Sequence, residues 1–281
     1  MFQIQTPAKI NPLLYILKKR PDGYHELYMH MVPISLFDTL RFEDNGHQGI
    51  QLSVEGIQID GDPNQNLVLK ATRLFEQRSG KLVHQTIHLQ KQIPVGAGLG
   101  GGSGNAAGTL VALNYLYQSP LTVEQLKMAA SELGSDVPFF IEPCPCEVQG
   151  RGEKIQPLST YPSCWLVVVK PPFSISTAQA YGQCRPLLQK EFPSIPSFDA
   201  FLQNLYNQFE VTLLPNFPEL LRIKEILLQN GALAALVSGS GSSVFGVFRN
   251  QMEQQQAYAI LSSTVLGNVF LCQTLTYHRY C

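Results

Sequence analysis

Alternating apolar and polar residues predict strands in several parts of the chain. Phe2–Gln5 alternates, Pro7 is expected to interrupt that strand, and residues 50–59 and 84–93 alternate again. A turn is predicted at Pro21-Asp22-Gly23, because proline fixes its φ and glycine tolerates a positive φ. Apolar runs predict further buried strand at residues 13–17, 165–170, 233–237, 244–248 and 268–275.

Between these strands, apolar residues recur at the spacing of helices. Leu67, Ala71, Leu74 and Phe75 share one face of a helix predicted over residues 66–79. Thr122 and Gln125 form a capping box, which predicts the start of a helix that ends at Gly134. Further helices are predicted over residues 105–117, 198–209, 217–229 and 251–266.

The irregular order of strands and helices indicates an α+β fold rather than a regular parallel α/β fold. Residues 142–163 are rich in proline and glycine, which predicts loops and a domain boundary. We therefore expect an N-terminal part over residues 1–155 and a C-terminal α+β part over residues 156–281.

Composition narrows the classes of function. Of the 281 residues, 44% are hydrophobic and 15% are charged, which allows a large core, and the net charge is -1. No basic excess favours nucleic acid or a membrane surface, and no apolar run reaches the roughly 18–20 residues of a membrane span. No secretory pattern is seen at the N-terminus, so we expect a cytoplasmic protein. We also expect it to be a monomer or a weak homodimer.

The six cysteines do not predict a disulfide framework, because they are scattered over a long, core-rich chain. Cys144 and Cys146 form a C-x-C pair without a second pair at metal-binding spacing. The histidines are not spaced as metal ligands either. We interpret the cysteines as ordinary thiols and expect no protein-bound metal site.

Residues 96–104 form the sharpest candidate for chemistry, and we call this segment the glycine-rich loop. Six of its nine residues are glycine, and a predicted helix follows directly. Glycine lets the backbone wrap closely around an anion, and the N–H groups of the next helix add positive potential. Ser103 could cap that helix or donate its hydroxyl to a phosphate or to a hydrated magnesium ion.

Two familiar glycine motifs do not account for this loop. The dinucleotide fingerprint requires an acidic residue that closes a second strand, whereas Glu124 here opens a helix. A Walker A loop requires lysine at the position of Gly102. The alternative to a phosphate loop is a flexible linker or a set of glycines that permit tight packing.

Asp136 and Lys9 are polar residues in apolar surroundings. Asp136 precedes Val137-Pro138-Phe139-Phe140, which makes it a candidate base, with a helix N-cap as the alternative role. Lys9 lies within an apolar strand region, where its burial would be costly unless the ammonium were paired. An exposed strand end is the alternative for Lys9.

Two further segments are candidates for binding. Tyr24 and His25 follow the predicted turn and could stack on a base or hydrogen-bond to it, or they could be ordinary turn residues. Residues 238–243, Ser-Gly-Ser-Gly-Ser-Ser, join two apolar strands, and we call them the serine–glycine loop. This loop could approach phosphates through its backbone, or it could be a plain β-turn.

Taken in order, these segments resemble the superfamily of galactokinase, homoserine kinase, mevalonate kinase and phosphomevalonate kinase, the GHMP kinases. The resemblance rests on Pro7-Ala8-Lys9-Ile10-Asn11, on the Pro94–Ala107 segment and on the serine–glycine loop. Arg20-Pro21-Asp22-Gly23-Tyr24-His25-Glu26-Leu27 and Gly134-Ser135-Asp136-Val137-Pro138-Phe139-Phe140 bring the match closest to one branch. That branch phosphorylates a cytidine-diphosphate derivative of methylerythritol in the non-mevalonate route to isoprenoids.

The resemblance implies a fold, an activity and roles. It implies two α+β lobes, an active site in the cleft between them, and transfer of phosphate from ATP with Mg²⁺ to the 2-hydroxyl of that small molecule. Asp136 would be the base and Lys9 its partner. The implied substrate-binding residues are Asn11, Tyr24, His25, Thr177 and Tyr181. The implied ATP-binding residues are Asn66, Pro94, Gly96, Gly98, Leu99, Gly100, Gly101, Gly102, Ser103 and Gly104.

The chain departs from the family pattern at two positions, and other functions remain open. Gly104 stands where the family usually has a second serine, and Pro12 stands where it favours an aliphatic residue. One alternative is another kinase of the superfamily, acting on mevalonate or homoserine, although those substrates carry no base for Tyr24 and His25 to hold. Another is a catalytically silent regulator that binds nucleotide.

Overall fold

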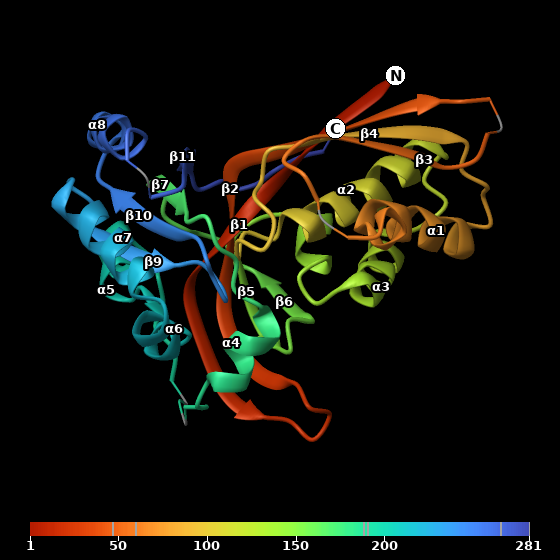
Figure 1. Ribbon diagram of the computed structural model, residues 1–281. Coiled ribbons are helices and arrows are strands. Elements are labelled where there is room, and N and C mark those ends of the chain that lie inside the picture. The colour runs from red at the N-terminus through yellow and green to blue at the C-terminus, as the bar shows by residue number, and fades with distance from the viewer. Residues whose placement is uncertain (47, 60, 188, 190, 265, 281) are drawn as a thin grey trace.

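The computed structural model describes residues 1–46, 48–59, 61–187, 189, 191–264 and 266–280, and their strands form two sheets (Figure 1). The first sheet contains β1 (Phe2–Lys19), β2 (His25–Asp44), β3 (Gln51–Gly56), β4 (Gln85–Lys91), β5 (Cys146–Gly150), β6 (Lys154–Pro157) and β8 (Tyr206–Asn207). The second sheet has the order β11-β7-β10-β9, with β7 (Trp165–Lys170), β9 (Ala234–Val237), β10 (Val244–Phe248) and β11 (Asn268–Gln273).

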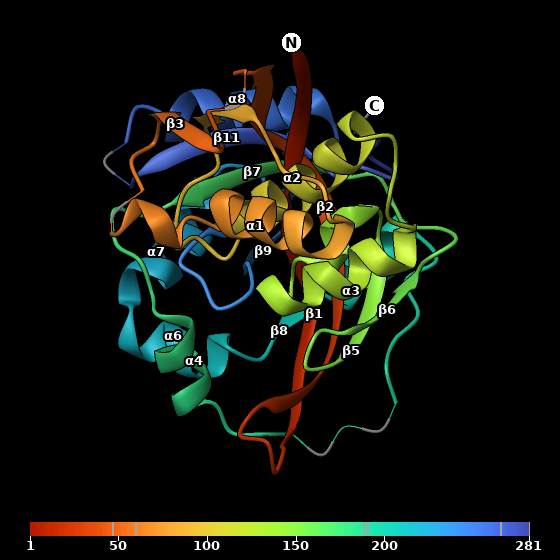
Figure 2. The same cartoon turned by 90° about the vertical axis from the view of Figure 1, so that its right-hand side faces the viewer.

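The helices divide between the two sheets, which confirms the α+β class. The first group lies with the first sheet and consists of α1 (Leu67–Ser79), α2 (Gly101–Leu116) and α3 (Val123–Leu133), with the short 3-10 helices η1 (Pro63–Gln65) and η2 (Pro138–Ile141). The others are α4 (Thr177–Gln183), α5 (Phe198–Gln203), α6 (Glu210–Asn216), α7 (Pro218–Gln229) and α8 (Gln251–Leu261). Figure 2 shows α1, α2 and α3 in front of the long strands β1 and β2.

Strand β1 is continuous, so the expected interruption at Pro7 is wrong. The strand pairs with β2 from Phe2 to Lys19, and its register shifts between Pro7 and Ala8 and again between Ile10 and Leu13. Both prolines of the strand lie at these irregularities, where the missing N–H group costs little because the ladder is already disrupted.

The middle of β1 is buried on both of its faces. Ala8 and Ile10 pack in a cluster with the second-sheet residues Leu166 and Phe245. Because side chains alternate along a strand, Lys9 and Asn11 face the opposite way. Strand β2 adds a further link between the sheets, since the bridge between Ile34 and Thr274 joins it to the chain just beyond β11.

Helix α2 begins earlier than expected, at Gly101 rather than at residue 105. Its N-cap is Gly100, which has a φ of 70° and makes no side-chain cap hydrogen bond, so Ser103 lies inside the helix and does not cap it. The sequence prediction failed because the glycines that weaken a helix also occupy its first turn here. The capping box of Thr122 and Gln125 at the start of α3 is confirmed.

Three other predictions need correction. The loop-rich segment 142–163 contains the β5–β6 hairpin, which extends the first sheet through the pairing of β5 with β2. The helix expected over residues 198–209 ends at Gln203, and β8 follows it, while α8 ends at Leu261 rather than at residue 266. The domain boundary at residue 155 stays a prediction. The two parts are not separate in the sheets, since β8 of the C-terminal part pairs with β1 of the first sheet.

Within the described residues, no helix has the length and apolar character needed to cross a membrane.

We expect Gly108→Ala to lower the stability of the fold. A Cβ atom at Gly108 would lie 2.4 Å from Cγ2 of Thr6 and 3.0 Å from Cδ1 of Ile4, so α2 could no longer pack as closely on β1. Overpacking of this kind costs about 1–3 kcal/mol of unfolding free energy, measurable by denaturant unfolding. The matched control is Gly182→Ala in α4, where a Cβ would meet no atom within 4 Å, and equal stability of the two variants would contradict the prediction.

Candidate active site

A single cleft of about 1890 Å³ brings most of the predicted site residues together. Its walls come from β1, the glycine-rich loop, the turn after α3, α4 and the serine–glycine loop. The predicted residues that line it are Lys9, Asn11, Tyr24, His25, Asn66, Pro94, Gly96, Gly98, Gly100, Gly101, Gly102, Ser103, Asp136, Thr177 and Tyr181. Leu99 and Gly104 are not among the residues that line the cleft.

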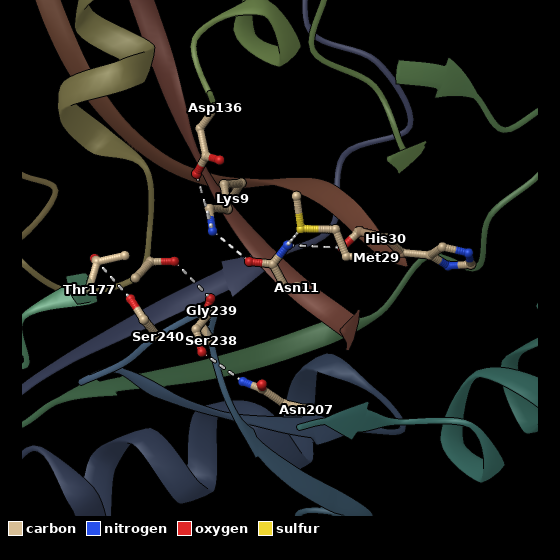
Figure 3. Close-up of polar contacts among 11 residues, drawn as sticks. Lys9, Asn11, Met29, His30, Asp136, Thr177, Asn207, Ser238, Gly239 and Ser240 are labelled. Atoms are coloured by element: carbon tan, nitrogen blue, oxygen red, sulfur yellow. Dashed lines mark hydrogen bonds and ion pairs between the residues drawn. The ribbon is translucent and has the colours of Figure 1, made fainter. Parts of the chain in front are cut away.

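Lys9 is a buried cation on the cleft-facing side of β1. Only 5% of the residue is exposed, which overturns the alternative that it marks an exposed strand end. Its Nζ lies 3.6 Å from Oδ2 of Asp136 and donates a hydrogen bond of 2.5 Å to Oδ1 of Asn11 (Figure 3). Burial lowers the pKa of Lys9 below that of an ordinary lysine, and the charge of Asp136 partly opposes this shift.

Asn11 fixes the position of the Lys9 ammonium in this ion pair. Its Nδ2 donates to the carbonyl oxygen of His30 on β2 at 3.1 Å, so Oδ1 is left to accept from Lys9. The alternation of β1 places both side chains on one face, and the pairing with β2 supplies the carbonyl.

Asp136 reaches the cleft from the turn between α3 and η2. Val137, rather than Asp136, is the N-cap of η2, and no side-chain cap hydrogen bond is formed there. The alternative that Asp136 caps this helix is therefore wrong. Its side chain is 33% exposed, so the carboxylate faces the cleft while it remains beside Lys9.

The glycine-rich loop lies against β1 and is folded by glycines with positive φ. Gly96, Gly98 and Gly100 have φ values of 62°, 73° and 70°, a region that side chains rarely allow. The carbonyl of Leu99 accepts a hydrogen bond of 2.9 Å from the N–H of Lys9, so the loop runs beside the lysine. Leu99 thus serves the site through its backbone, while its side chain is buried.

The first turn of α2 supplies free donors to the cleft. The first N–H groups of a helix have no partner within the helix, and Gly101, Gly102 and Ser103 all line the cleft. These groups and the helix dipole favour an anion at this position. An ordered loop that leads into a helix is not a flexible linker, and the phosphate loop stays a prediction.

The serine–glycine loop is more than an isolated β-turn, because it packs on the glycine-rich loop. Oγ of Ser238 donates to the carbonyl of Gly98 at 3.1 Å, and the N–H of Ser243 donates to the carbonyl of Ala97 at 3.1 Å. On its other side, the hydroxyls of Ser240 and Thr177 lie 3.1 Å apart (Figure 3).

Aromatic residues gather at the far end of the cleft. The rings of His25 and Tyr181 stack with centroids 5.2 Å apart and an interplanar angle of 18°. The guanidinium of Arg151 lies 5.2 Å above the ring of Tyr24, which is 52% exposed. Burial and the nearby Lys19 lower the pKa of His25, whereas burial and the charge of Asp136 raise the pKa of Tyr181, so both rings are neutral near pH 7.

The sequence analysis missed a buried network beneath the glycine-rich loop. Lys91, at the end of β4, forms an ion pair with Asp38 of β2, and Asn105 donates to the same carboxylate at 2.9 Å. The other oxygen of Asp38 accepts from the N–H groups of Gln92 and Ile93, which lead into the loop. No local motif marks these residues, and the only signal was a lysine on the apolar side of an alternating strand, two positions after Leu89.

The described cysteines are free thiols. The sulfur atoms of Cys144 and Cys146 lie 3.7 Å apart and share a thiol hydrogen bond rather than a disulfide.

Comparison with known proteins gives the family of the chain. Residues 66–142 match the model of the GHMP kinases N terminal domain, and residues 187–266 match that of the GHMP kinases C terminal domain. A 4-diphosphocytidyl-2-C-methyl-D-erythritol kinase of Syntrophus aciditrophicus (strain SB) is 36% identical over 98% of this chain and 100% of its own length. The chain belongs to this family of GHMP kinases.

Solved structures agree with this assignment. A crystal structure of 4-(cytidine 5'-diphospho)-2C-methyl-D-erythritol kinase superimposes with a TM-score of 0.85 at 32% identity, covering 97% of this chain and 99% of that one. The mevalonate kinase of L. major, solved with R-mevalonate, shares the fold with a TM-score of 0.72 at 17% identity, over 98% of this chain and 96% of that one. This GHMP kinase is thus an ATP-dependent small-molecule kinase.

We expect Gly98→Ala to destabilise this kinase by separating the two loops. A Cβ at Gly98 would lie 2.1 Å from the carbonyl oxygen of Ser238, and its φ of 73° disfavours any side chain. We expect a loss of about 1–3 kcal/mol in unfolding free energy, together with weaker ATP binding.

The control for this prediction is Gly102→Ala. Its Cβ would meet only Cδ1 of Leu67, at 3.5 Å, so we expect no loss of stability without ligand. Thermal unfolding of both variants checks the comparison, and a Gly98→Ala protein as stable as Gly102→Ala would contradict the close packing of the loops.

Proposed function

We propose that this GHMP kinase transfers the γ-phosphoryl group of ATP to the 2-hydroxyl of 4-diphosphocytidyl-2-C-methyl-D-erythritol. The observation that carries the proposal is the Lys9–Asp136 pair, which lies between a glycine-rich loop and an aromatic acceptor end in one cleft. The names of the relatives support the same substrate.

ATP binds along the glycine-rich loop in this proposal. The backbone from Gly96 to Ser103 and the free N–H groups of α2 cradle the phosphates, with Pro94 leading into the loop. Asn66, whose side chain caps α1 through the N–H of Val68 at 2.9 Å, lies at the adenosine end. Leu99 and Gly104 support the loop from behind the cleft surface. Leu99 does so through its carbonyl, which accepts from the N–H of Lys9, and Gly104 allows close packing, since a Cβ there would lie 3.1 Å from the carbonyl oxygen of Pro7.

The acceptor occupies the opposite end. Tyr24, His25 and Tyr181 offer ring faces and a hydrogen-bonding imidazole to the cytosine. Thr177 lines the same side, and Asn11 holds the methylerythritol end near Lys9. Mevalonate and homoserine carry no base for these rings, so the acceptor end favours the cytidyl substrate over those of the other kinases.

The chemistry follows from the ion pair. Asp136 accepts the proton of the 2-hydroxyl as its oxygen attacks the γ-phosphorus, and ADP leaves on the opposite side. Lys9 is the cationic partner of the Asp136 carboxylate and stabilises negative charge on the attacking oxygen. The proton resides on Asp136 until product leaves, which balances the transfer.

Magnesium accompanies ATP in this proposal. Within the described part of the chain, no cluster of three or more metal-ligating side chains is present, and Asp62 and Asp136 are the carboxylates that line the cleft. Magnesium keeps several waters and is commonly held by substrate phosphates with one or two protein groups, so this sparse donor set fits it. Ser103 is the hydroxyl of the loop that would reach the hydrated ion.

We expect Asp136→Asn to lower kcat by at least about 100-fold, the usual effect of losing a general base. ADP release is measured with Mg-ATP and 4-diphosphocytidyl-2-C-methyl-D-erythritol, with mevalonate and homoserine as competing acceptors. Asp199→Asn, a carboxylate in the first turn of α5, is the matched control and should retain activity. Turnover with another acceptor would overturn the substrate, and ATP binding without any turnover would favour the silent-regulator alternative.

We expect kcat to fall as the pH rises, and to do so at a pH below the pKa of an ordinary lysine. Burial lowers the pKa of Lys9, so rising pH removes its proton early, and Asp136 then loses its cationic partner. A pH profile of kcat checks this, with Lys9→Arg expected to move the alkaline limb upward because guanidinium stays charged. A wild-type kcat that stayed constant up to pH 10.5, the ordinary lysine value, would contradict the proposed role.

A further inference from the structure

A buried side chain, Asn207, and a partly buried one, Glu210, hold the serine–glycine loop from outside the cleft. We propose that Asn207 and Glu210 form a clamp that positions this loop, and through it Lys9 and Asn11, for phosphoryl transfer. Neither residue lines the cleft, so both are positioning residues rather than catalytic ones. The kinetic part of this inference rests on the proposed function above.

Asn207 uses its whole side-chain amide in the clamp. Its Nδ2 donates to the carbonyl oxygen of Gly239 at 2.8 Å (Figure 3). The same nitrogen also donates to the carbonyl oxygen of Val237 at 2.8 Å. Its Oδ1 accepts from the N–H of Phe209 at 3.0 Å, which fixes the orientation of the amide. The residue is 2% exposed, so water cannot replace these bonds if they are lost.

Glu210 holds the same segment through the N–H group of Val237. Its Oε1 accepts from the N–H of Val237 at 2.7 Å, and its Oε2 forms an ion pair with Lys224 of α7. The two side chains therefore bond both polar backbone groups of Val237, the last residue before the loop. The loop leaves β9 in a direction that these bonds set.

The clamp is anchored on β1, the strand that carries Lys9. Asn207 belongs to β8, which pairs in parallel with β1, and Asn207 lies opposite Leu14. Lys9 is five positions earlier on β1. The paired strands β8 and β1 thus fix the amide of Asn207 relative to the ammonium of Lys9. Gly239 of the loop contacts both side chains.

Gly239 transmits the position of the clamp to the ion pair. A Cβ at Gly239 would lie 3.2 Å from both Nζ of Lys9 and Oδ1 of Asn11, so its backbone packs directly on them. Displacement of the loop would admit water to the Lys9 ammonium, which would raise its lowered pKa. The same displacement would release Ser238 from Gly98 of the glycine-rich loop.

The test compares Asn207→Asp with Asn204→Asp. Both changes remove an amide that donates to a backbone carbonyl, but Asn204 bonds Ala200 within α5, away from the loop. We expect Asn207→Asp to lower kcat about 10- to 100-fold, the effect of a misplacement near 1 Å. We also expect its alkaline limb to shift to higher pH and amide hydrogen exchange to quicken in residues 238–243, with neither change in Asn204→Asp.

A second comparison separates the clamp from the stability of the fold. Glu210→Gln keeps an oxygen that can accept from Val237, whereas Glu210→Ala removes it, and Lys224→Met removes only the ion pair. We expect Glu210→Gln and Lys224→Met to keep kcat within about threefold of wild type and Glu210→Ala to lose about tenfold or more. This comparison decides the matter if Asn207→Asp fails to fold.

Variants of Asn207 and Glu210 that lower the melting temperature but leave kcat and the pH profile unchanged would overturn the inference. Wild-type protein without turnover on any acceptor would instead overturn the proposed function. The exchange measurement would then still test the clamp, because unchanged exchange in residues 238–243 of Asn207→Asp would refute it.

Discussion

The burial of the Lys9 ammonium is the constraint on which the site depends. A cation removed from water costs several kcal/mol unless charge and hydrogen bonds compensate it. The protein supplies Asp136 at 3.6 Å and Asn11 at 2.5 Å, from the turn before η2 and from the same strand. The strand, the turn and the loops around them must therefore hold their relative positions for the lysine to stay charged.

Close backbone contact between two loops meets this requirement. The glycine-rich loop lies beside Lys9 through the carbonyl of Leu99, and the serine–glycine loop packs on it through Ser238 and Gly98. Glycine is needed at Gly98 because a Cβ there would overlap the Ser238 carbonyl oxygen. The same glycines leave the first turn of α2 open to an anion, so in the proposed function one set of small residues serves both packing and phosphate binding.

In the proposed function, the two ends of the cleft serve different purposes. The fold is shared with a mevalonate kinase at 17% identity, so the framework alone does not determine the acceptor. The proposed acceptor end carries Tyr24 together with His25 and Tyr181, and burial and neighbouring charges keep the rings of His25 and Tyr181 neutral. A planar, uncharged base suits such an end better than a small aliphatic acid does.

The sequence by itself determined many of the local elements and which residues are candidates for the chemistry. Alternation in Pro7-Ala8-Lys9-Ile10-Asn11 places Lys9 and Asn11 on one face, and the run of glycines before an apolar helix predicts a phosphate loop. The capping box of α3 and the strands around the serine–glycine loop were likewise predictable, because each depends on residues close together in the chain.

Only the tertiary structure decided which of these groups meet. Pro7 does not end β1, because long-range pairing with β2 absorbs the proline at a register shift. Asp136 reaches Lys9 across 127 positions of the chain, and Asn207 and Asp38 support the loops without any local motif. Such contacts join residues that are distant in sequence, and a local pattern carries no information about the partner that folding brings to it.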